Sequence, residues 1–332
     1  MSTKIRVIDH ALLARLVPMS QAIFLMRSAF AQISHKSGKA QVPIRIHLQN
    51  KQQTESLYMP VILDDCETYG IKIVGMNAAN MSKNLPFISA TVLLMDRETG
   101  GIRAFLDGSY ITALRTGAAS GLATDLLALP EADTLAIFGT GKQAVTQLEA
   151  VVEVRKLQKV LIFNRTPQHA QAFAAAMHAR FGIEMIVASA PEQVREAQII
   201  CTATTSSKPV FDAAHISAGT HINAVGAYRE DMAEIPSPTV QDAQIVVDQL
   251  AASLKEAGDL IQPLKAGLIK MEDLQTELGH IVLGEKQGRT RREDITLFKS
   301  VGNAAQDLVV AEAAWKAAEA QDAGISIPWS MS

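Results

Sequence analysis

Three basic residues with apolar neighbours are candidates for binding an anionic substrate: Arg45, Lys72 and Arg115. Lys72 lies in the strand-like run 70–74, where a buried ammonium group needs a counter-charge or a ligand. Alternation along a strand could instead place Lys72 on a solvated face, and Arg115 equally suits a helix surface. Because the planar fork of arginine matches a carboxylate, we expect the three cations to form a carboxylate clamp.

The segment Gly139-Thr140-Gly141-Lys142-Gln143-Ala144 has the spacing of a dinucleotide-binding turn. It follows the apolar run 134–138 and opens a helical pattern at 142–155. The first glycine suits a tight turn, the second lets the backbone approach a pyrophosphate, and the alanine permits close packing of helix and strand. The first N–H groups of the helix would bind the phosphates, although a glycine turn without a ligand could have the same sequence.

The next strand ends in Asn164-Arg165-Thr166, where an enzyme that uses NAD usually presents an acidic residue to the ribose hydroxyls. A guanidinium group with a neighbouring amide and hydroxyl suits a 2′-phosphate instead. We therefore expect NADP(H) as the cofactor, with NAD(H) as a poorer substitute. The alternative is that Arg165 is a solvated loop charge.

The elements that would position these residues follow a βα pattern typical of a doubly wound parallel sheet. Ligands of such sheets bind at the carboxyl ends of the strands, so Thr202, Ala203 and Thr204 are expected to line the dinucleotide, as are Val225, Gly226 and Ala227. The β-rich runs are 134–138, 159–164, 185–188, 198–202, 221–225 and 244–247.

The first part of the chain is organised differently, with two helical segments followed by strand-like runs. Turn residues at 96–101 predict a hairpin, and an alanine- and leucine-rich helix is expected at 109–129. A last helix at 303–321 is expected to fold back onto this part. The other expected helices are 9–16 and 20–33, and the expected strands are 41–48, 56–62, 70–74, 90–95 and 102–106.

Length and composition indicate an enzyme of two domains, because 332 residues exceed the usual size of a single core. A formal charge of −3 gives no reason to expect nucleic acid or a membrane as partner. Two cysteines, Cys66 and Cys201, and no visible targeting segment lead us to expect a cytoplasmic protein. The 8 histidines have no metal-binding spacing, so no metal is expected, and His221 is expected to be structural.

Four segments together resemble the ornithine cyclodeaminase and μ-crystallin family: 111–120, 139–144, 221–227 and 298–302. The resemblance implies a homodimer in which a Rossmann-type domain (116–303) is inserted in a second α/β domain (1–115 plus 304–332) for substrate binding and dimerisation. It also implies that Arg45, Lys72 and Arg115 bind the substrate carboxylate. Thr116, Ser300 and Gly302 are then expected to line the dinucleotide.

Within that family, cyclodeaminases and related alanine dehydrogenases carry an aspartate directly after the segment that matches 225–227. This chain has Tyr228 there, which argues against cyclodeamination and is expected to line the substrate site. Members similar to μ-crystallin also lack the aspartate, share the Asn-Arg-Thr signature, and reduce cyclic ketimines. Asp231 matches an aspartate of those members, although an aspartate at a helix start would be an equal explanation.

We therefore expect hydride transfer from NADPH to the C=N carbon of Δ1-pyrroline-2-carboxylate or Δ1-piperideine-2-carboxylate, which gives L-proline or L-pipecolate. Lys72, Asp231 or a bound water could supply the proton. The alternatives are a cyclodeaminase, an amino-acid dehydrogenase of the alanine type, an opine-type synthase, or a non-catalytic protein that binds NADPH.

Overall fold

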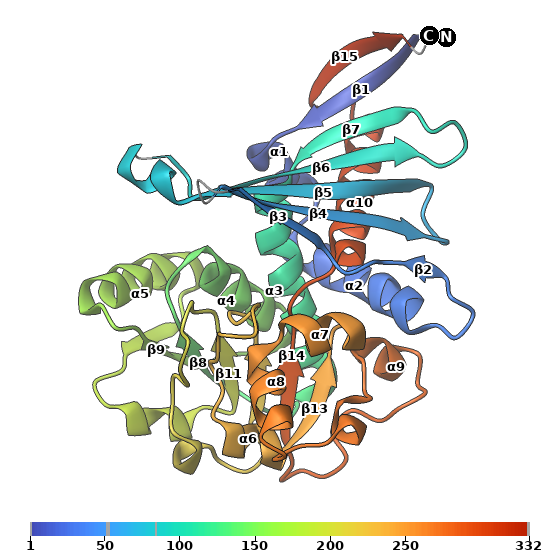
Figure 1. Cartoon of the computed structure of the whole chain (residues 1–332). Helices are drawn as coiled ribbons and strands as arrows, with labels where there is room; N and C mark the ends of the chain where they lie inside the picture. The colour runs from blue at the N-terminus through green and yellow to red at the C-terminus, as the bar shows by residue number, and fades with distance from the viewer. Residues whose placement is uncertain (1, 51–53, 84, 331–332) are drawn as a thin grey trace. The chain divides into compact units, whose positions relative to one another are not determined.

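A computed structural model describes residues 2–50, 54–83 and 85–330. The chain divides into two compact units, Met1–Arg115 with Asn303–Ser332 and Thr116–Gly302. Each unit contains its own β-sheet (Figure 1). The functional roles expected of the two parts of the chain stay predictions.

In the first unit, the described residues form a sheet of eight strands in the order β15-β1-β7-β6-β5-β4-β2, with β3 paired to β4. Neighbouring strands are antiparallel except for β1 and β7. The strands are β1 (Ser2–Ile8), β2 (Ala40–Gln41), β3 (Ile46–Gln49), β4 (Thr54–Leu63), β5 (Thr68–Asn77), β6 (Ile88–Asp96), β7 (Ile102–Asp107) and β15 (Ile325–Ser330).

One face of this sheet is covered by helix α10 (Ala304–Ala320), which packs against β4, β5 and β6 as the sequence predicted. Along β5, Lys72 and Val74 are buried on this face, whereas Ile73 points to the opposite face and is 38% exposed. Helix α2 packs in turn against α10. The remaining helical segments are α1 (His10–Leu16), α2 (Met19–Ser34), η1 (Ala78–Lys83) and α3 (Gly108–Leu127), of which α3 continues into the second unit.

The predicted strand at 41–48 is wrong. The structure has two short strands there, β2 and β3, and Arg45 precedes β3 instead of lying within a strand. Pro43 explains the interruption, because proline has no N–H group to donate to a neighbouring strand. The hairpin of β6 and β7 is confirmed, with Gly100 at φ +70° in its turn.

Residues 116–302 are all described, and their seven strands form one parallel sheet in the order β10-β9-β8-β11-β12-β14-β13. This topology confirms the predicted Rossmann-type fold. Strand β14 was not predicted, and it lies between β12 and β13. The strands are β8 (Thr134–Phe138), β9 (Lys159–Phe163), β10 (Glu184–Val187), β11 (Ile199–Thr202), β12 (His221–Ala224), β13 (Ala243–Val247) and β14 (Ile295–Lys299).

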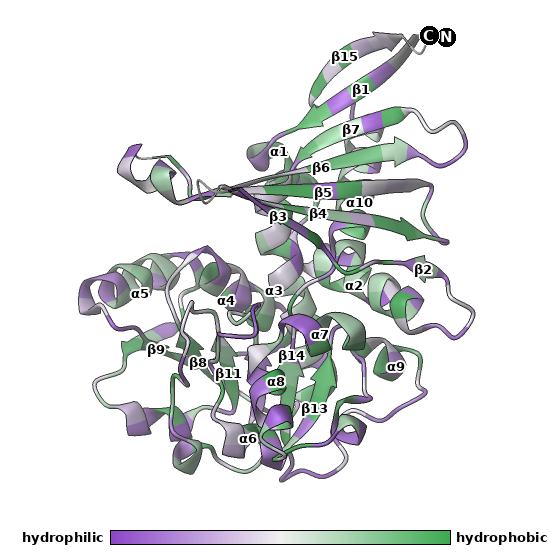
Figure 2. Ribbon diagram, in the orientation of Figure 1, coloured by the Kyte–Doolittle hydropathy of each residue, from purple (hydrophilic) through white to green (hydrophobic). Residues whose placement is uncertain are grey.

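The second sheet is buried on both faces, which explains why its strands are continuous apolar runs (Figure 2). Leu135 and Ile137 of β8 pack with α4 and α5, whereas Ala136 and Phe138 pack with α6, α7 and α8 on the other face. The helical segments are α4 (Lys142–Val154), α5 (Pro167–Phe181), η2 (Pro191–Glu196), η3 (Ala213–His215), α6 (Ser237–Asp242), α7 (Leu250–Glu256), α8 (Gly258–Lys265), η4 (Met271–Leu274) and α9 (Leu278–Val282).

Candidate active site

The two glycines of the predicted dinucleotide turn differ in what surrounds them. Gly139 has φ +97°, and a Cβ atom there would lie 2.6 Å from the Ala203 carbonyl oxygen, so the turn itself requires glycine. Gly141 has φ −82° and is the N-cap residue of α4, and a Cβ atom there would meet nothing within 4 Å. The backbone at Gly141 therefore borders open space at a helix N-terminus, where a phosphate would fit.

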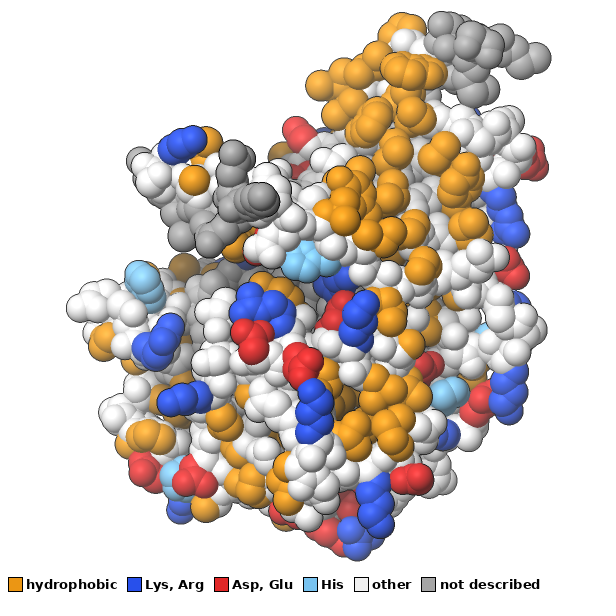
Figure 3. Space-filling model, viewed as in Figure 1, with side chains coloured by type: hydrophobic (Ala, Val, Ile, Leu, Met, Phe, Trp, Pro, Cys, Tyr) orange, Lys and Arg blue, Asp and Glu red, His pale blue; other side chains and the backbone are white. Residues whose placement is uncertain are grey.

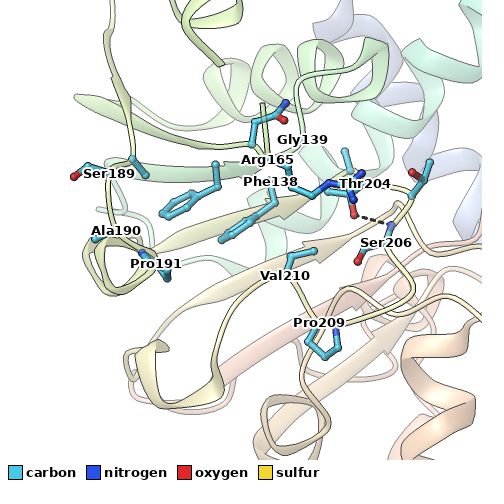
Figure 4. Close-up of a pocket in the computed structure, with 15 residues that line it drawn as sticks. Phe138, Gly139, Arg165, Ser189, Ala190, Pro191, Thr204, Ser206, Pro209 and Val210 are labelled. Atoms are coloured by element: carbon cyan, nitrogen blue, oxygen red, sulfur yellow. Dashed lines mark hydrogen bonds between the residues drawn. The ribbon is translucent and has the colours of Figure 1, made fainter. Parts of the chain in front are cut away.

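A cavity of about 630 Å³ lies at the carboxyl ends of the strands in the second unit (Figure 4). This volume is in the range of small-molecule sites. The rings of Phe138 and Phe163 stack at its edge with centroids 4.4 Å apart. The lining residues follow four successive strands: Phe138, Gly139, Phe163, Asn164, Arg165, Ala188, Ser189, Ala190, Pro191, Ala203, Thr204, Thr205, Ser206, Pro209 and Val210.

The loop after β9 is held in place by the amide of Asn164. Its Nδ2 donates to Thr140 Oγ1, and its Oδ1 accepts from the Thr166 N–H at 3.0 Å. Arg165 is exposed between these two anchors and lines the cavity. No acidic residue is among the described residues that line this cavity, and a buried acceptor, Gln143 Oε1, has no hydrogen-bond partner among the described atoms. The exposed Arg165 and the lack of an acidic side chain among these lining residues fit a phosphate-bearing dinucleotide.

A buried carboxylate that the sequence analysis missed, Glu234, organises the loops after β11 and β12. It accepts hydrogen bonds from Thr202 Oγ1 at 2.9 Å and from the N–H groups of Thr204, Gly226 and Ala227 at 2.6, 2.7 and 3.1 Å. Burial raises the pKa of Glu234. The Thr202 hydroxyl, expected to line the dinucleotide, is thus turned towards Glu234, while Ala203 and Thr204 line the cavity.

A second buried carboxylate, Asp248, holds the segment after β14. Its Oδ2 accepts from Ser300 Oγ at 2.8 Å, from the Val301 N–H at 3.0 Å and from the Gly302 N–H at 2.6 Å. The polar groups expected at Ser300 and Gly302 therefore have partners inside the protein. Lys299, a lysine in the apolar strand β14, would have been a signal for the buried carboxylates around Glu234, since its Nζ pairs with Asp259 at 2.8 Å and Asp259 accepts from the Glu234 N–H at 2.6 Å.

Other residues expected at the site take varied positions in the second unit. Thr116 is buried, and its carbonyl accepts from Gln147 Nε2 at 3.3 Å. Lys142 is exposed at the first turn of α4, and Tyr228, like Val225, is partly buried. Asp231 is exposed and accepts two hydrogen bonds from Arg229 at 2.9 and 3.0 Å, which hold the pKa of its carboxyl below the ordinary value.

The first unit contains a buried cluster of charges in which Lys72 is only 3% exposed. Its Nζ lies 2.7 Å from Asp307 Oδ2, and Arg115 Nε lies 3.4 Å from Asp307 Oδ1. Burial lowers the pKa of Lys72 from 10.5 to about 8; Asp307 opposes this effect, whereas Arg115 and Arg45 strengthen it. Lys72 therefore lies inside the protein and not on the solvated face that the sequence left open.

Asp307 is the counter-charge that Lys72 required, and the sequence analysis missed it. The only signal was an acidic residue in the first turn of an alanine-rich helix. The charges of Lys72, Arg115 and Asp307 sum to +1, and the partly buried Arg45 adds to the positive potential at Lys72. Gln306 also belongs to it, because its Oε1 accepts from Arg115 at 2.8 Å while its buried Nε2 has no partner among the described atoms. A bound anion would supply the acceptor that Gln306 Nε2 lacks among the described atoms.

His221 has the structural role that was predicted for it. Its ring is fully buried and bonds to Thr296 Oγ1 at 2.9 Å and Asn223 Oδ1 at 3.2 Å, and burial lowers its pKa to about 3. The imidazole is thus neutral at physiological pH. Among the helices that the structure describes, none has both the length and the apolar character needed to cross a bilayer.

Comparison with known proteins places this geometry in a family. The family model described as "Ornithine cyclodeaminase/mu-crystallin family" matches residues 7–322. A Δ1-pyrroline-2-carboxylate reductase from Bacillus cereus is 41% identical over 300 residues, which are 90% of this chain and 92% of the relative.

Two solved structures are similar over nearly the whole chain. The Δ1-pyrroline-2-carboxylate reductase of Thermococcus litoralis, in complex with NADH and L-proline, has a TM-score of 0.92 at 39% identity, covering 97% of this chain and all of that one (100%). An archaeal alanine dehydrogenase dimer with bound NAD has a TM-score of 0.91 at 32% identity, covering 98% and 99%. The chain is an oxidoreductase, as predicted. The resemblance noted in the sequence is confirmed: the chain belongs to the ornithine cyclodeaminase/mu-crystallin family.

Proposed function

We propose that the protein reduces cyclic imino acids with NADPH, converting Δ1-pyrroline-2-carboxylate to L-proline and Δ1-piperideine-2-carboxylate to L-pipecolate. The observation that carries this proposal is the cluster of two buried cations, Lys72 and Arg115, around the carboxylate of Asp307, with the partly buried Arg45 acting on Lys72 electrostatically. Its surplus of positive charge suits a substrate that carries one carboxylate. The Bacillus and Thermococcus relatives, named Δ1-pyrroline-2-carboxylate reductases, support the same substrate class.

In this proposal the second unit holds the dinucleotide and the first unit holds the substrate. The turn at Gly139 and Gly141 would bind the pyrophosphate, and the cavity beside it would take the adenosine end. When bound, the reduced nicotinamide supplies the hydride that is added to the imine carbon.

Lys72 is the proton donor that the geometry favours for the imine nitrogen. A general acid is most effective when its pKa is near the working pH, and burial brings the pKa of Lys72 to about 8. Asp231 fits this role poorly, because its pKa is lowered by Arg229 and its carboxyl is ionised at neutral pH. Arg115, held by Gln306 and Asp307, would bind the carboxylate.

The preference for NADPH over NADH rests on the end of β9. Arg165 lines the cavity, and no acidic side chain is among the described lining residues to accept hydrogen bonds from ribose hydroxyls. The Thermococcus relative was solved with NADH, so the preference is a proposal about this chain's own residues.

Turnover by the purified protein tests the function. NADPH or NADH oxidation is followed with Δ1-pyrroline-2-carboxylate, Δ1-piperideine-2-carboxylate, or pyruvate plus ammonia, and ornithine is offered with NAD. We expect turnover of the cyclic imines to dominate. Faster reduction of pyruvate with ammonia would identify an alanine dehydrogenase, and proline formed from ornithine would identify a cyclodeaminase. NADPH binding without turnover of any of these substrates would indicate a binding protein.

We also propose that the protein is a homodimer formed through the first unit. By strand register, seven exposed hydrophobic side chains share the sheet face opposite α10, and Figure 3 shows hydrophobic side chains gathered over these strands. Exposed apolar areas of this kind mark association surfaces. The archaeal alanine dehydrogenase relative is a dimer, which supports the proposal. The seven residues are Ile46, Leu48, Ile62, Ile73, Ile325, Ile327 and Trp329.

A further inference from the structure

Asp307 is buried between the two cations that the proposed reaction uses for different purposes. Its side chain is 2% exposed, and its two carboxylate oxygens are divided between Lys72, at 2.7 Å, and Arg115, at 3.4 Å. Lys72 Nζ also donates to Thr112 Oγ1 at 3.3 Å. An isolated carboxylate in such a position would be very costly, whereas here it stabilises two cationic side chains that repel each other.

The charged groups around Lys72 come from three parts of the first unit. Asp307 lies on α10, Arg115 on α3, and Arg45 on the segment before β3. Asp307 is the anion among them, so its removal would leave three cations to repel one another. Lys72 would relieve this repulsion by losing its proton, because an arginine side chain does not do so in proteins.

We propose that Asp307 is the positioning residue of this site: it holds Lys72 beside Arg115 and keeps the Lys72 ammonium protonated, so that Lys72 delivers its proton to the imine nitrogen. This inference rests on the proposed imine reduction. In each turnover the hydride bonds to the imine carbon and the Lys72 proton bonds to the nitrogen. Lys72 becomes a neutral amine, and water returns the proton to it.

The chain offers a matched control on the same helix. Glu312 is a second buried carboxylate of α10 that is bonded to β5, since it accepts from the N–H and Oγ1 of Thr68 at 2.9 and 2.6 Å. It also pairs with Lys316 at 2.9 Å. Glu312→Gln therefore removes a comparable charge and disturbs comparable packing, away from Lys72 and Arg115.

The test is the pH profile of kcat/KM for the cyclic imine that the protein reduces, measured for the wild type, Asp307→Asn and Glu312→Gln. Activity of the wild type should fall as Lys72 loses its proton above pH 8. Asp307→Asn should move this alkaline limb down by about 1 to 3 pH units, the usual effect of removing a close opposite charge. It should lower kcat at pH 7.5 and leave KM nearly unchanged, because the negative charge removed at Asp307 is offset by the proton that Lys72 loses.

Glu312→Gln should lower the melting temperature and leave the alkaline limb of the kcat/KM profile at the same pH as in the wild type. An unmoved alkaline limb in Asp307→Asn, or an equal shift in both variants, would overturn the proposal.

A second readout needs no turnover: the Lys72 side chain is titrated by ¹³C and ¹⁵N NMR and assigned by the signal lost in Lys72→Arg. A lower pKa of Lys72 in Asp307→Asn supports the inference, and an unchanged pKa contradicts it. If the wild type reduced no imine, the NMR result would still stand and the proposed function alone would fail.

Discussion

The buried ammonium group of Lys72 is stabilised by the carboxylate of Asp307 and repelled by the guanidinium groups of Arg115 and Arg45. From the sequence, a lysine in a strand could be predicted as unusual, but its environment could not. The strand pattern is the same for a solvated face and for a buried one, and the deciding group, Asp307, lies on a helix from the other end of the chain. A long-range ion pair leaves no local pattern in the sequence.

Lys72 should make the free energy of unfolding depend on pH in the alkaline range. Its pKa is about 8 in the folded protein against an ordinary value of 10.5, so between these values the unfolded chain binds the proton more tightly. The contribution of Lys72 to the free energy of unfolding should therefore rise from pH 8 to 10.5, and its penalty is fully present below pH 8. At about 1.4 kcal/mol per pH unit, the contribution is about 3 kcal/mol.

Urea unfolding of the wild type and Lys72→Met at several pH values measures this contribution. The free energy of unfolding of the wild type, minus that of Lys72→Met at the same pH, should rise from pH 8 to 10.5. Cys66 and Cys201, whose pKa values burial raises to about 12, act in the opposite direction above pH 9 but equally in both proteins. Parallel curves for the two proteins would show that Lys72 titrates normally.

Arg165 should determine the choice between NADPH and NADH. Arg165→Ser removes a charge-assisted hydrogen bond to the 2′-phosphate, which typically contributes about 1.5–3 kcal/mol, so kcat/KM with NADPH should fall by about 10- to 150-fold. The value with NADH should change little. Arg180→Ser, at the other end of α5 and paired with Glu149, is the control and should leave both values unchanged. If Arg165→Ser lowered kcat/KM equally with NADPH and NADH, Arg165 would not determine the choice of cofactor.

At the scale of elements, six of the seven strands of the second sheet could be predicted, because most are short apolar runs buried on both faces; only β14 was missed. Strand β1 was missed because its alternation includes Lys4 and Arg6, and Arg6 is buried against Glu319 at 2.7 Å. Strand β15 contains Pro328, which argues locally against a strand. In both cases the partner strand, and not the local sequence, stabilises the element.

Alanine substitutions at Gly139 and Gly141 should distinguish a glycine that the fold requires from one that the ligand requires. Gly141→Ala meets no protein atom within 4 Å and keeps an ordinary φ of −82°, so the melting temperature should not fall. If the backbone at Gly141 approaches the pyrophosphate, the dissociation constant for NADPH should rise by about 10-fold or more. Gly139→Ala should lower the melting temperature instead, because it needs φ +97° and would clash with Ala203.

Thermal unfolding without cofactor and fluorescence titration with NADPH measure the two effects separately. Unchanged NADPH binding in Gly141→Ala would mean that the phosphates do not approach this turn.

For the whole molecule, the sequence predicted the α/β class and the Rossmann-type sheet, because these follow from the order of the elements. It did not predict which face of the first sheet is open. That depends on α10, a helix from the other end of the chain, which covers the face of Lys72 and Val74 and leaves Ile73 on the uncovered one. The apolar character of the uncovered face is the physical reason to expect a second copy of the chain.

Association through the uncovered face of the first sheet should be sensitive to a single charge placed on β5. Ile73→Glu places a carboxylate on β5 among exposed hydrophobic side chains and leaves the α10 face unchanged. Phe24→Glu, on α2 and 71% exposed in the wild type, is the control. Sedimentation velocity at micromolar concentration should show a dimer for the wild type and for Phe24→Glu, and a monomer for Ile73→Glu.

The physical reason for this sensitivity is symmetry. In a two-fold dimer the same patch serves both subunits, so each substitution enters the interface twice. Two unpaired carboxylates buried in an apolar contact cost several kcal/mol each, enough to dissociate a dimer of ordinary affinity. A wild type that sediments as a monomer, or an Ile73→Glu variant that remains a dimer, would show that this face does not join two copies of the chain.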